Sequence, residues 1–198
     1  MWRLMRSCLL ASVMLSGFAT HAWCAVTTEL EGQQIEDSFT VSGTKLVLNG
    51  ASVRKRAYFK TELVALYLPE RKRNLDAVNK LPGAKRVQIT ILRTLSGSVL
   101  SRYFINDFKA ETTDEEFKSL INEVGIIGGY YASMHQLNRG DTVSVDWVPE
   151  LQGIVAFVNG KQMGPPMKSE AMYQVLLRMF IAPMGSSQDY RDAMMSAK

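Results

Sequence analysis

The sequence of 198 residues is 46% hydrophobic and 21% charged, as in ordinary globular proteins. Its length fits one domain, which is large enough to bury a core without a disulfide or a structural metal. The formal net charge is +4, and the basic run at residues 71–73 is short. Nucleic acid is therefore excluded as a predicted partner, because its binding needs a clustered basic face.

The first 25 residues have the pattern of a secretory signal peptide. Arg3 and Arg6 precede an apolar run at 8–18, and small residues follow. The run is about 11 residues long, whereas a helix that spans a membrane needs about 20. We predict a signal peptide at residues 1–25, cleaved near 22–25, and a periplasmic or secreted location; a retained anchor is the weaker alternative. Loss of the two arginines lowers the net charge from +4 to +2.

The remaining domain, residues 26–198, offers few side chains for metal or nucleophilic chemistry. Cys8 leaves with the signal peptide and Cys24 lies at the cut, so no internal disulfide is predicted. His135 is the only histidine beyond the signal peptide, too few for a zinc site, and no Gly-x-Ser-x-Gly elbow accompanies it. The glycines at 125–129 lack the spacing of a phosphate-binding loop. We therefore predict no metal and no cofactor.

The first half of the domain is predicted to be rich in strands. Val26–Phe39 is polar with no clear period and is interpreted as an arm. Strands are predicted at Thr44–Leu48, Ser52–Phe59 and Glu62–Leu68. Asn49-Gly50 is a strong hairpin signal between the first two strands, and the third strand could continue the second after a bend at 59–61. The unbroken apolar run at 63–68 is typical of a strand that is covered on both faces.

The second half of the domain alternates helices and strands. Helices are predicted at 74–81, 96–108, 169–181 and 187–195, and strands at 85–93, 141–148 and 153–158. Thr113 and Glu116 form a capping box, which predicts that another helix starts there. Apolar residues at helical spacing extend this helix to about His135. The glycines at 125–129 mark either a break in it or, as the slightly preferred interpretation, a place of close packing. Asn159-Gly160 is a second hairpin signal. Without a repeated βαβ unit, the order predicts an α+β fold with a mostly antiparallel sheet.

Charged residues stand close to the most apolar strand. Arg54 and Glu62 are separated by an even number of residues, so they share a face in a continuous strand or in a hairpin centred near Tyr58. A buried arginine needs a partner. We therefore interpret Arg54 as a cleft residue with Glu62 beside it; an ordinary pair on the surface is the alternative.

The stretch LVLNGASVRKRAYFKTELVALYLPE at 46–70 resembles the chalcone isomerase superfamily, and especially its bacterial exported branch. That branch has a Leu-x-Leu-Asn-Gly-x-Gly-x-Arg opening, followed by a strand that ends in Leu-Tyr-Leu. The likeness continues through 87–108, 146–161 and 169–183. It implies an open-faced β-sandwich, in which helices pack on a large antiparallel sheet and a ligand cleft lies between them.

The resemblance also implies roles for single residues. Plant enzymes of the superfamily cyclise a chalcone to a flavanone, and relatives without isomerase activity hold a fatty acid carboxylate with the same arginine, which matches Arg54. The enzyme's threonine, tyrosine and asparagine positions fall on Glu62, Leu100 and Asp107. Each lost hydrogen bond to a developing oxyanion can cost about 10²–10³ in rate. The resemblance therefore favours a protein that binds a ligand over one that isomerises it.

The first predicted function is a non-catalytic exported protein that binds a fatty acid or a similar amphipathic acid. Arg54 would hold the head, and Leu100, Phe104, Val64 and Leu66 would hold the tail, because small-molecule sites are mostly apolar with few polar anchors.

Two alternatives stay open. The protein could be an intramolecular lyase or isomerase of the chalcone isomerase type, with Tyr103, Glu62 or Asp107 as the acid or base. It could instead be a structural module with a filled core that supports a partner, such as a membrane-associated protein.

Overall fold

The fold is built on one antiparallel sheet of seven strands. The computed structural model describes residues 27–196, so the predicted signal peptide at 1–25, its cleavage site and residue 26 lie outside the described residues. In spatial order the sheet contains β11 (Lys161–Gln162), β10 (Gly153–Val158), β9 (Thr142–Val148), β6 (Lys85–Ile91), β5 (Phe59–Leu68), β4 (Thr44–Arg56) and β3 (Ser38–Val41). Every neighbouring pair is antiparallel.

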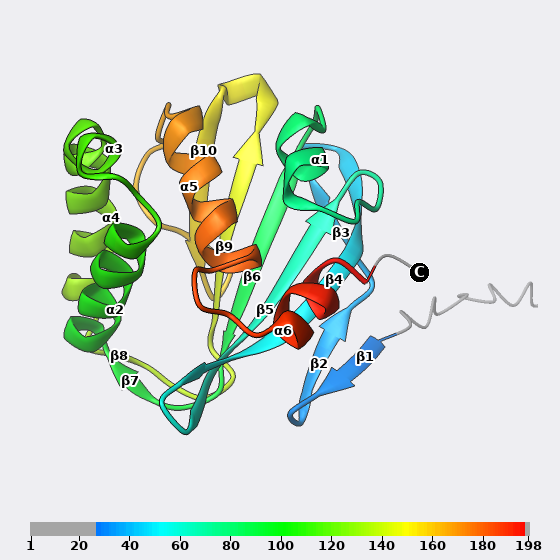
Figure 1. Ribbon diagram of the computed structural model, residues 1–198, viewed down its shortest axis with the longest axis horizontal. Helices are drawn as coiled ribbons and strands as arrows, with labels where there is room; N and C mark the ends of the chain where they lie inside the picture. Colours follow the sequence, from blue (N-terminus) through cyan, green and yellow to red (C-terminus); the bar gives the residue numbers. More distant parts are fainter. Residues whose placement is uncertain (1–26, 197–198) are drawn as a thin grey trace, which may run out of the picture.

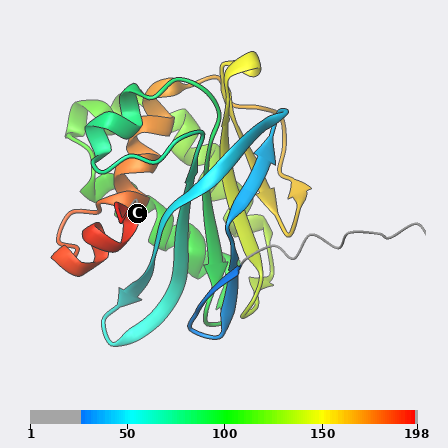
Figure 2. The same ribbon diagram turned by 90° about the vertical axis from the view of Figure 1, so that its right-hand side faces the viewer.

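Two short strand pairs and the helices complete the described chain. The pairs are β1 (Thr27–Leu30) with β2 (Gln33–Glu36), and β7 (Leu95–Ser96) with β8 (Gln136–Leu137). The helices are α1 (Leu75–Lys80), α2 (Gly97–Ala110), α3 (Asp114–Ser119), α4 (Ile121–Ser133), α5 (Glu170–Ile181), α6 (Gln188–Met194) and the 3-10 turn η1 (Pro149–Leu151). The α-helices gather on one side of the sheet (Figures 1 and 2). The predicted α+β fold, with helices packed on a large antiparallel sheet, is confirmed.

The sheet separates two apolar clusters, and β5 contributes to both. Val64 and Leu66 face the helices, whereas Leu63 and Tyr67 face the opposite side. All four side chains are almost completely buried, as the unbroken apolar run predicts. β5 is therefore fixed on both faces, which makes it a rigid support for the charged residues at its start.

The arm predicted at Val26–Phe39 is wrong where the structure describes it, because this segment forms β1, β2 and the start of β3. Ile35 is buried in the cluster on the face away from the helices. Phe39 packs edge-on against Tyr67, with ring centroids 4.8 Å apart. Strands of four residues with so few apolar side chains are too short to show an alternation, which is why the sequence has no clear period here.

The turn predicted at Asn49-Gly50 is also wrong, because β4 runs through it and the register to β5 shifts there. The Asn49 side chain donates to the Met194 carbonyl (2.9 Å) and accepts from the Lys72 backbone N–H (2.6 Å). A Cβ on Gly50 would clash with the Ala193 carbonyl oxygen of α6. The pair serves close packing with the C-terminal helix, and the actual turn is at residues 57–58.

The single helix predicted from Thr113 to about His135 is broken at Leu120 into α3 and α4. The capping box of Thr113 is present. Among the glycines, only Gly128 packs closely, since a Cβ there would lie 3.3 Å from the side chain of Ile105, whereas Gly125 and Gly129 have open space around them. Within residues 27–196, none of the helices has the length and apolar character that crossing a membrane requires.

Candidate functional site

Arg54 of β4 and Glu62 of β5 are direct cross-strand partners. The β4–β5 hairpin places both side chains on the face that the helices cover, as their even spacing predicts. The Arg54 guanidinium lies 3.6 Å from the Glu62 carboxylate, and the two side chains are only 11% and 8% exposed. The pair is therefore an internal feature of the sheet–helix interface.

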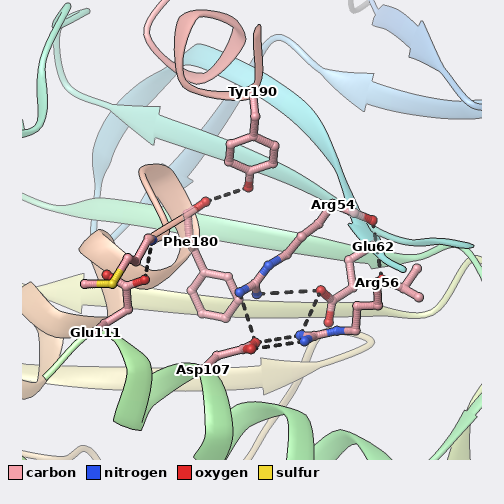
Figure 3. A network of polar contacts seen from close by, with 9 residues as sticks. Arg54, Arg56, Glu62, Asp107, Glu111, Phe180 and Tyr190 are labelled. Atoms are coloured by element: carbon pink, nitrogen blue, oxygen red, sulfur yellow. Dashed lines mark hydrogen bonds and ion pairs between the residues drawn. The ribbon is translucent and has the colours of Figure 1, made fainter. Parts of the chain in front are cut away.

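Asp107 of α2 joins this pair from the helical layer (Figure 3). Its Oδ2 lies 2.9 Å from Nη2 of Arg54. Arg56 donates to both Asp107 oxygens, at 3.0 and 2.6 Å. Two parallel hydrogen bonds of this kind are the strongest form of arginine–carboxylate contact. Asp107 thus ties α2 to β4 through both arginines.

A bulge in β5 determines which charges enter this cluster. Arg54 pairs with Glu62, but Lys55 pairs with Lys60, so Thr61 is an extra residue on β5. The side chain of Thr61 donates to the Arg54 carbonyl (3.3 Å). The extra residue brings Glu62 to the face of Arg54, while Lys60 lies with Lys55 on the other face, where it contacts Glu31 at 2.6 Å. Without the bulge, Lys60 would share the face of Glu62, because strand side chains alternate.

We call Arg54, Arg56, Glu62 and Asp107 the ion cluster. Its formal charges cancel, two cations against two carboxylates. Burial opposes the charge of Arg56, but the hydrogen bonds to Asp107 and the charge of Glu62 outweigh it, so the pKa of Arg56 is raised. The cluster still holds two buried atoms without a hydrogen-bond partner among the described residues, Nε of Arg56 and Oε2 of Glu62. Oε2 of Glu62 still has ionic contacts with Arg54 and Arg56, at 3.6 and 3.5 Å, so the unsatisfied donor of the cluster among the described residues is Nε of Arg56.

Aromatic rings support the two guanidinium groups. The Arg56 guanidinium lies 4.1 Å from the ring centre of Tyr103, and that of Arg54 lies 5.5 Å from the ring centre of Phe180. Tyr190 of α6 donates to the Phe180 carbonyl at 2.6 Å, which links α6 to the end of α5 beside the cluster (Figure 3). Cation–π contacts favour the charged form of arginine, so the rings help to keep the guanidinium groups in place.

An apolar cavity of about 50 Å³ lies beneath the helices next to the ion cluster. The side chains around it are almost all apolar or aromatic, and they include Phe104, Ile127, Tyr131, Met134, Val143, Val145, Ile154, Met163, Met167, Leu176 and Phe180. A smaller space of about 20 Å³ adjoins the ion cluster and shares the walls Phe104, Tyr131, Val143 and Phe180 with the cavity. The cluster therefore stands at one end of an apolar interior.

A groove of about 780 Å³ opens on the other side of the ion cluster. It runs between residues 51–56 of β4 and residues 183–187 after α5. Arg54, Arg56 and Asp107 line both this groove and the small internal space. The ion cluster is thus a partition between an outer groove and an apolar interior.

All six predicted site residues contribute to the small internal space: Arg54, Glu62, Leu100, Tyr103, Phe104 and Asp107. Two of the predicted tail contacts lie elsewhere, since Val64 and Leu66 are fully buried in the core. Arg56 was missed, although its spacing of two from Arg54 places it on the same face. Phe180 and Tyr131 were also missed, because only the fold brings α4 and α5 to this point.

Tyr131 has a buried hydroxyl beside the ion cluster. Burial raises the pKa of Tyr131, and the nearby charge of Glu62 adds to the effect. The hydroxyl therefore stays protonated at neutral pH and can donate a hydrogen bond rather than act as a base. Within residues 27–196, no group of three or more His, Cys, Asp or Glu side chains is placed to hold a metal ion.

Comparison with known families identifies the family to which the chain belongs. Residues 27–196 match the family described as chalcone isomerase-like. The chain belongs to the chalcone isomerase-like family. None of the curated proteins compared with it is a match. Among solved structures, it is similar to the crystal structure of the fatty-acid binding protein AtFAP1 from Arabidopsis thaliana, with a TM-score of 0.69 and 12% identity, over 86% of this chain and 95% of that chain.

At this identity, the likeness to AtFAP1 shows the fold alone. The chalcone isomerase-type fold predicted from the sequence is confirmed. The placement in a bacterial exported branch stays a prediction, as do the roles of the six site residues.

Proposed function

We propose that the protein is exported and binds a fatty acid or a similar amphipathic acid without turning it over. The observation that carries the proposal is the position of Arg54 and Arg56, which lie between a groove and an apolar interior. An amphipathic acid needs a cation for its head and apolar walls for its tail. The name of AtFAP1, a fatty-acid binding protein of the same fold, supports this class of ligand.

The head group would bind by replacing a carboxylate that is already present. Arg54 and Arg56 both contact Asp107, so a ligand carboxylate would take the place of Asp107 or share the guanidinium groups with it. The free Nε of Arg56 supplies an additional donor. Affinity should therefore depend on competition between two carboxylates, and not on the arginines alone.

The tail would occupy the apolar cavity, whose lining suits an acyl chain better than the mixed polar lining of the groove. The cavity of about 50 Å³ is smaller than the roughly 300–1,000 Å³ typical of a ligand pocket. Met134, Met163 and Met167 lie in its walls, and methionine adapts to new shapes more easily than branched side chains do. Binding would enlarge the cavity by moving these side chains.

A non-catalytic role is supported by the chemistry of the site. Three of the four polar positions that the family resemblance implies for the isomerase carry other residues, Glu62, Leu100 and Asp107. Two of these are carboxylates that would repel a phenolate nucleophile. A protein partner, including a membrane-associated one, stays a prediction.

The test is to purify the protein after export, read its N-terminus by mass spectrometry, and identify bound lipid by native mass spectrometry and extraction. Titration with a fluorescent fatty acid then compares Arg54→Gln with Arg86→Gln. Arg86 is a matched control, because it makes a bidentate pair with buried Asp146, at 2.7 Å for both contacts, on the other face of the sheet.

We expect affinity to fall at least tenfold in Arg54→Gln and to be unchanged in folded Arg86→Gln. Turnover of a chalcone by the wild-type protein would contradict the non-catalytic part. If the wild-type protein carries no lipid and shows no saturable binding or thermal shift with C12–C18 fatty acids, the binding proposal is wrong whether or not the variants fold.

A further inference from the structure

We propose that the end of the sheet formed by the β4–β5 turn is a docking surface for an anionic lipid membrane. This inference goes beyond the proposed ligand, because it concerns the outer surface and can be tested without any fatty acid. Its starting point is the sequence RKRAYFK at 54–60. Two large aromatic residues stand there between basic ones, at the tip of a long hairpin.

The two aromatic side chains at this tip are exposed to an unusual degree. Tyr58 is 96% exposed and Phe59 is 54% exposed. Tyr58 lies in the turn and Phe59 begins β5, so both stand at the tip of the hairpin, where a protein partner would need a matching hollow but a fluid lipid surface would not. Tyrosine is enriched at the membrane–water interface, because its ring is apolar and its hydroxyl is polar. The tip therefore presents side chains suited to the headgroup region.

Basic side chains surround the tip and come from several segments of the chain. The Arg93 guanidinium lies 4.2 Å from the ring centre of Phe59, which holds this ring beside a positive charge. Lys55 is exposed on β4, and Lys60 lies next to the ring in sequence. Arg139 ties the neighbouring turns together by donating to the carbonyls of Leu92 (2.8 Å) and Glu31 (2.7 Å). The turns lie at the same end of the sheet in both views (Figures 1 and 2).

The charge at this end is positive after the acidic residues are counted. Outside the ion cluster, the segments that meet here carry Lys55, Lys60, Arg93 and Arg139 against Glu31 and Asp141. Glu31 is paired with Lys60. Asp141 accepts from the Asn138 backbone N–H and from the Asn159 side chain. Four clustered cations are the lower limit of what binds anionic lipids through charge, and the exposed aromatics add an apolar contribution.

The position of this tip connects it to the groove. Lys55 and Lys60 line the groove, as does Met184, which is 77% exposed on the opposite rim. A protein docked through Tyr58 and Phe59 would therefore bring the mouth of the groove close to the lipid headgroups. An amphipathic molecule could then pass between the membrane and the groove without crossing open water.

The test is flotation of the exported protein with vesicles of phosphatidylglycerol and phosphatidylcholine, compared with pure phosphatidylcholine at the same ionic strength. Every variant is checked for the same N-terminus and for wild-type circular dichroism. The charge variant is Lys55→Gln, Lys60→Gln, Arg93→Gln, and the aromatic variant is Tyr58→Ser, Phe59→Ser. The control for the charge variant is the triple variant Lys45→Gln, Arg73→Gln, Lys168→Gln, which removes three exposed cations at the other end of the sheet. The control for the aromatic variant is Ile126→Ser, which removes an exposed apolar side chain of α4.

We expect binding to anionic vesicles that weakens with salt and is absent on neutral vesicles. Each basic residue near the surface contributes about a fivefold factor, so the charge variant should lose on the order of 100-fold in affinity. The aromatic variant should also bind much more weakly, and both controls should bind like the wild-type protein. No flotation with anionic vesicles, or equal binding by the test variants and their controls, would overturn the proposal. Such a failure leaves the fatty-acid proposal standing, because that is measured without vesicles.

Discussion

The substitution Asp107→Asn tests the ion cluster most directly, because it should weaken the fold and strengthen ligand binding at the same time. Asp107 makes three short contacts with Arg54 and Arg56, between 2.6 and 3.0 Å. Asparagine keeps the shape but removes the charge, and its amide nitrogen would face a guanidinium donor. The variant therefore isolates the charge of one carboxylate.

The loss of stability follows from the burial of these contacts. Removing one partner of a fully buried ion pair costs about 3–5 kcal/mol. The side chains of Asp107 and Arg56 are 19% exposed, so solvent screens part of the interaction and we expect about 2–3 kcal/mol. For a protein of this size, 1 kcal/mol corresponds to about 2–4 °C. The melting temperature should fall by about 4–12 °C.

The gain in affinity follows from the same charges. In Asp107→Asn, a ligand carboxylate no longer competes with Asp107 for the two arginines, and the cluster carries one net positive charge. A hydrogen bond to a charged group contributes about 1.5–3 kcal/mol, so dodecanoate should bind about 10–100-fold more tightly. Isothermal titration at a temperature where both proteins are folded measures this change, and thermal shifts should be larger in the variant.

Two controls separate this reasoning from a general loosening of the protein. Asp146→Asn breaks a bidentate pair with Arg86 on the other face of the sheet, so it should lower stability without raising affinity. The methyl ester of the same acid has no carboxylate and should gain nothing from Asp107→Asn. Unchanged or reduced affinity for dodecanoate in folded Asp107→Asn, or an equal gain for the ester, would refute the competition between carboxylates.

Three further substitutions test the packing around the site. Gly50→Ala brings a Cβ into the Ala193 carbonyl and should cost about 1–3 kcal/mol in denaturant unfolding, whereas Gly129→Ala, in open space on α4, should be neutral or stabilising. Gly164 has a φ of +67°, and in Gly164→Ala the new Cβ would clash with the Tyr130 hydroxyl. This variant should make the segment over the apolar cavity more sensitive to limited proteolysis than the control Gly160→Ala does. Burial lowers the pKa of Lys85, and the charge of Glu170 opposes this shift. Between that lowered pKa and 10.5, the folded state binds fewer protons than the unfolded state does. Stability therefore rises with pH in this range. Lys85→Met should remove this slope and add about 1 kcal/mol at neutral pH; a slope that persists would show that another group causes it.

The local pattern of the sequence was enough to predict the strand at the centre of the site and the pair beside it. The apolar run of β5 has no alternation, and burial of both faces is the reason. Arg54 and Glu62 are cross-strand partners, as their even spacing predicts, and the turn at residues 57–58 gives this pairing only together with the extra residue Thr61. In the same way, the spacing of two between Arg54 and Arg56 contained the information that would have found the second arginine.

The rest could not be predicted from local pattern, because distant segments decide it. Asn49-Gly50 has the composition of a turn, but its conformation is fixed by the carbonyls of α6, 145 residues later at Met194. The bulge at Thr61 depends on the pairing of β5 with its neighbours, where the Thr61 carbonyl accepts from the Leu92 backbone N–H at 2.9 Å. Phe180 reaches Arg54 only because α5 lies across the sheet.

The bulge at Thr61 connects the two proposals by sorting the charges of one hairpin. It leaves Arg54 and Arg56 facing the helices, where Glu62 and Asp107 neutralise them. Lys60 pairs with Lys55 and lies on the outer face, next to the exposed rings of the tip. After the same turn, an unbroken β5 would pair Arg54 with Thr61 and place Glu62 on the outer face beside Lys60, which would remove a carboxylate from the inner site and reduce the positive charge of the tip. One extra residue thus produces a neutral inner site, which an acid can enter only by competing with a carboxylate, and a basic outer tip, which an anionic surface can attract.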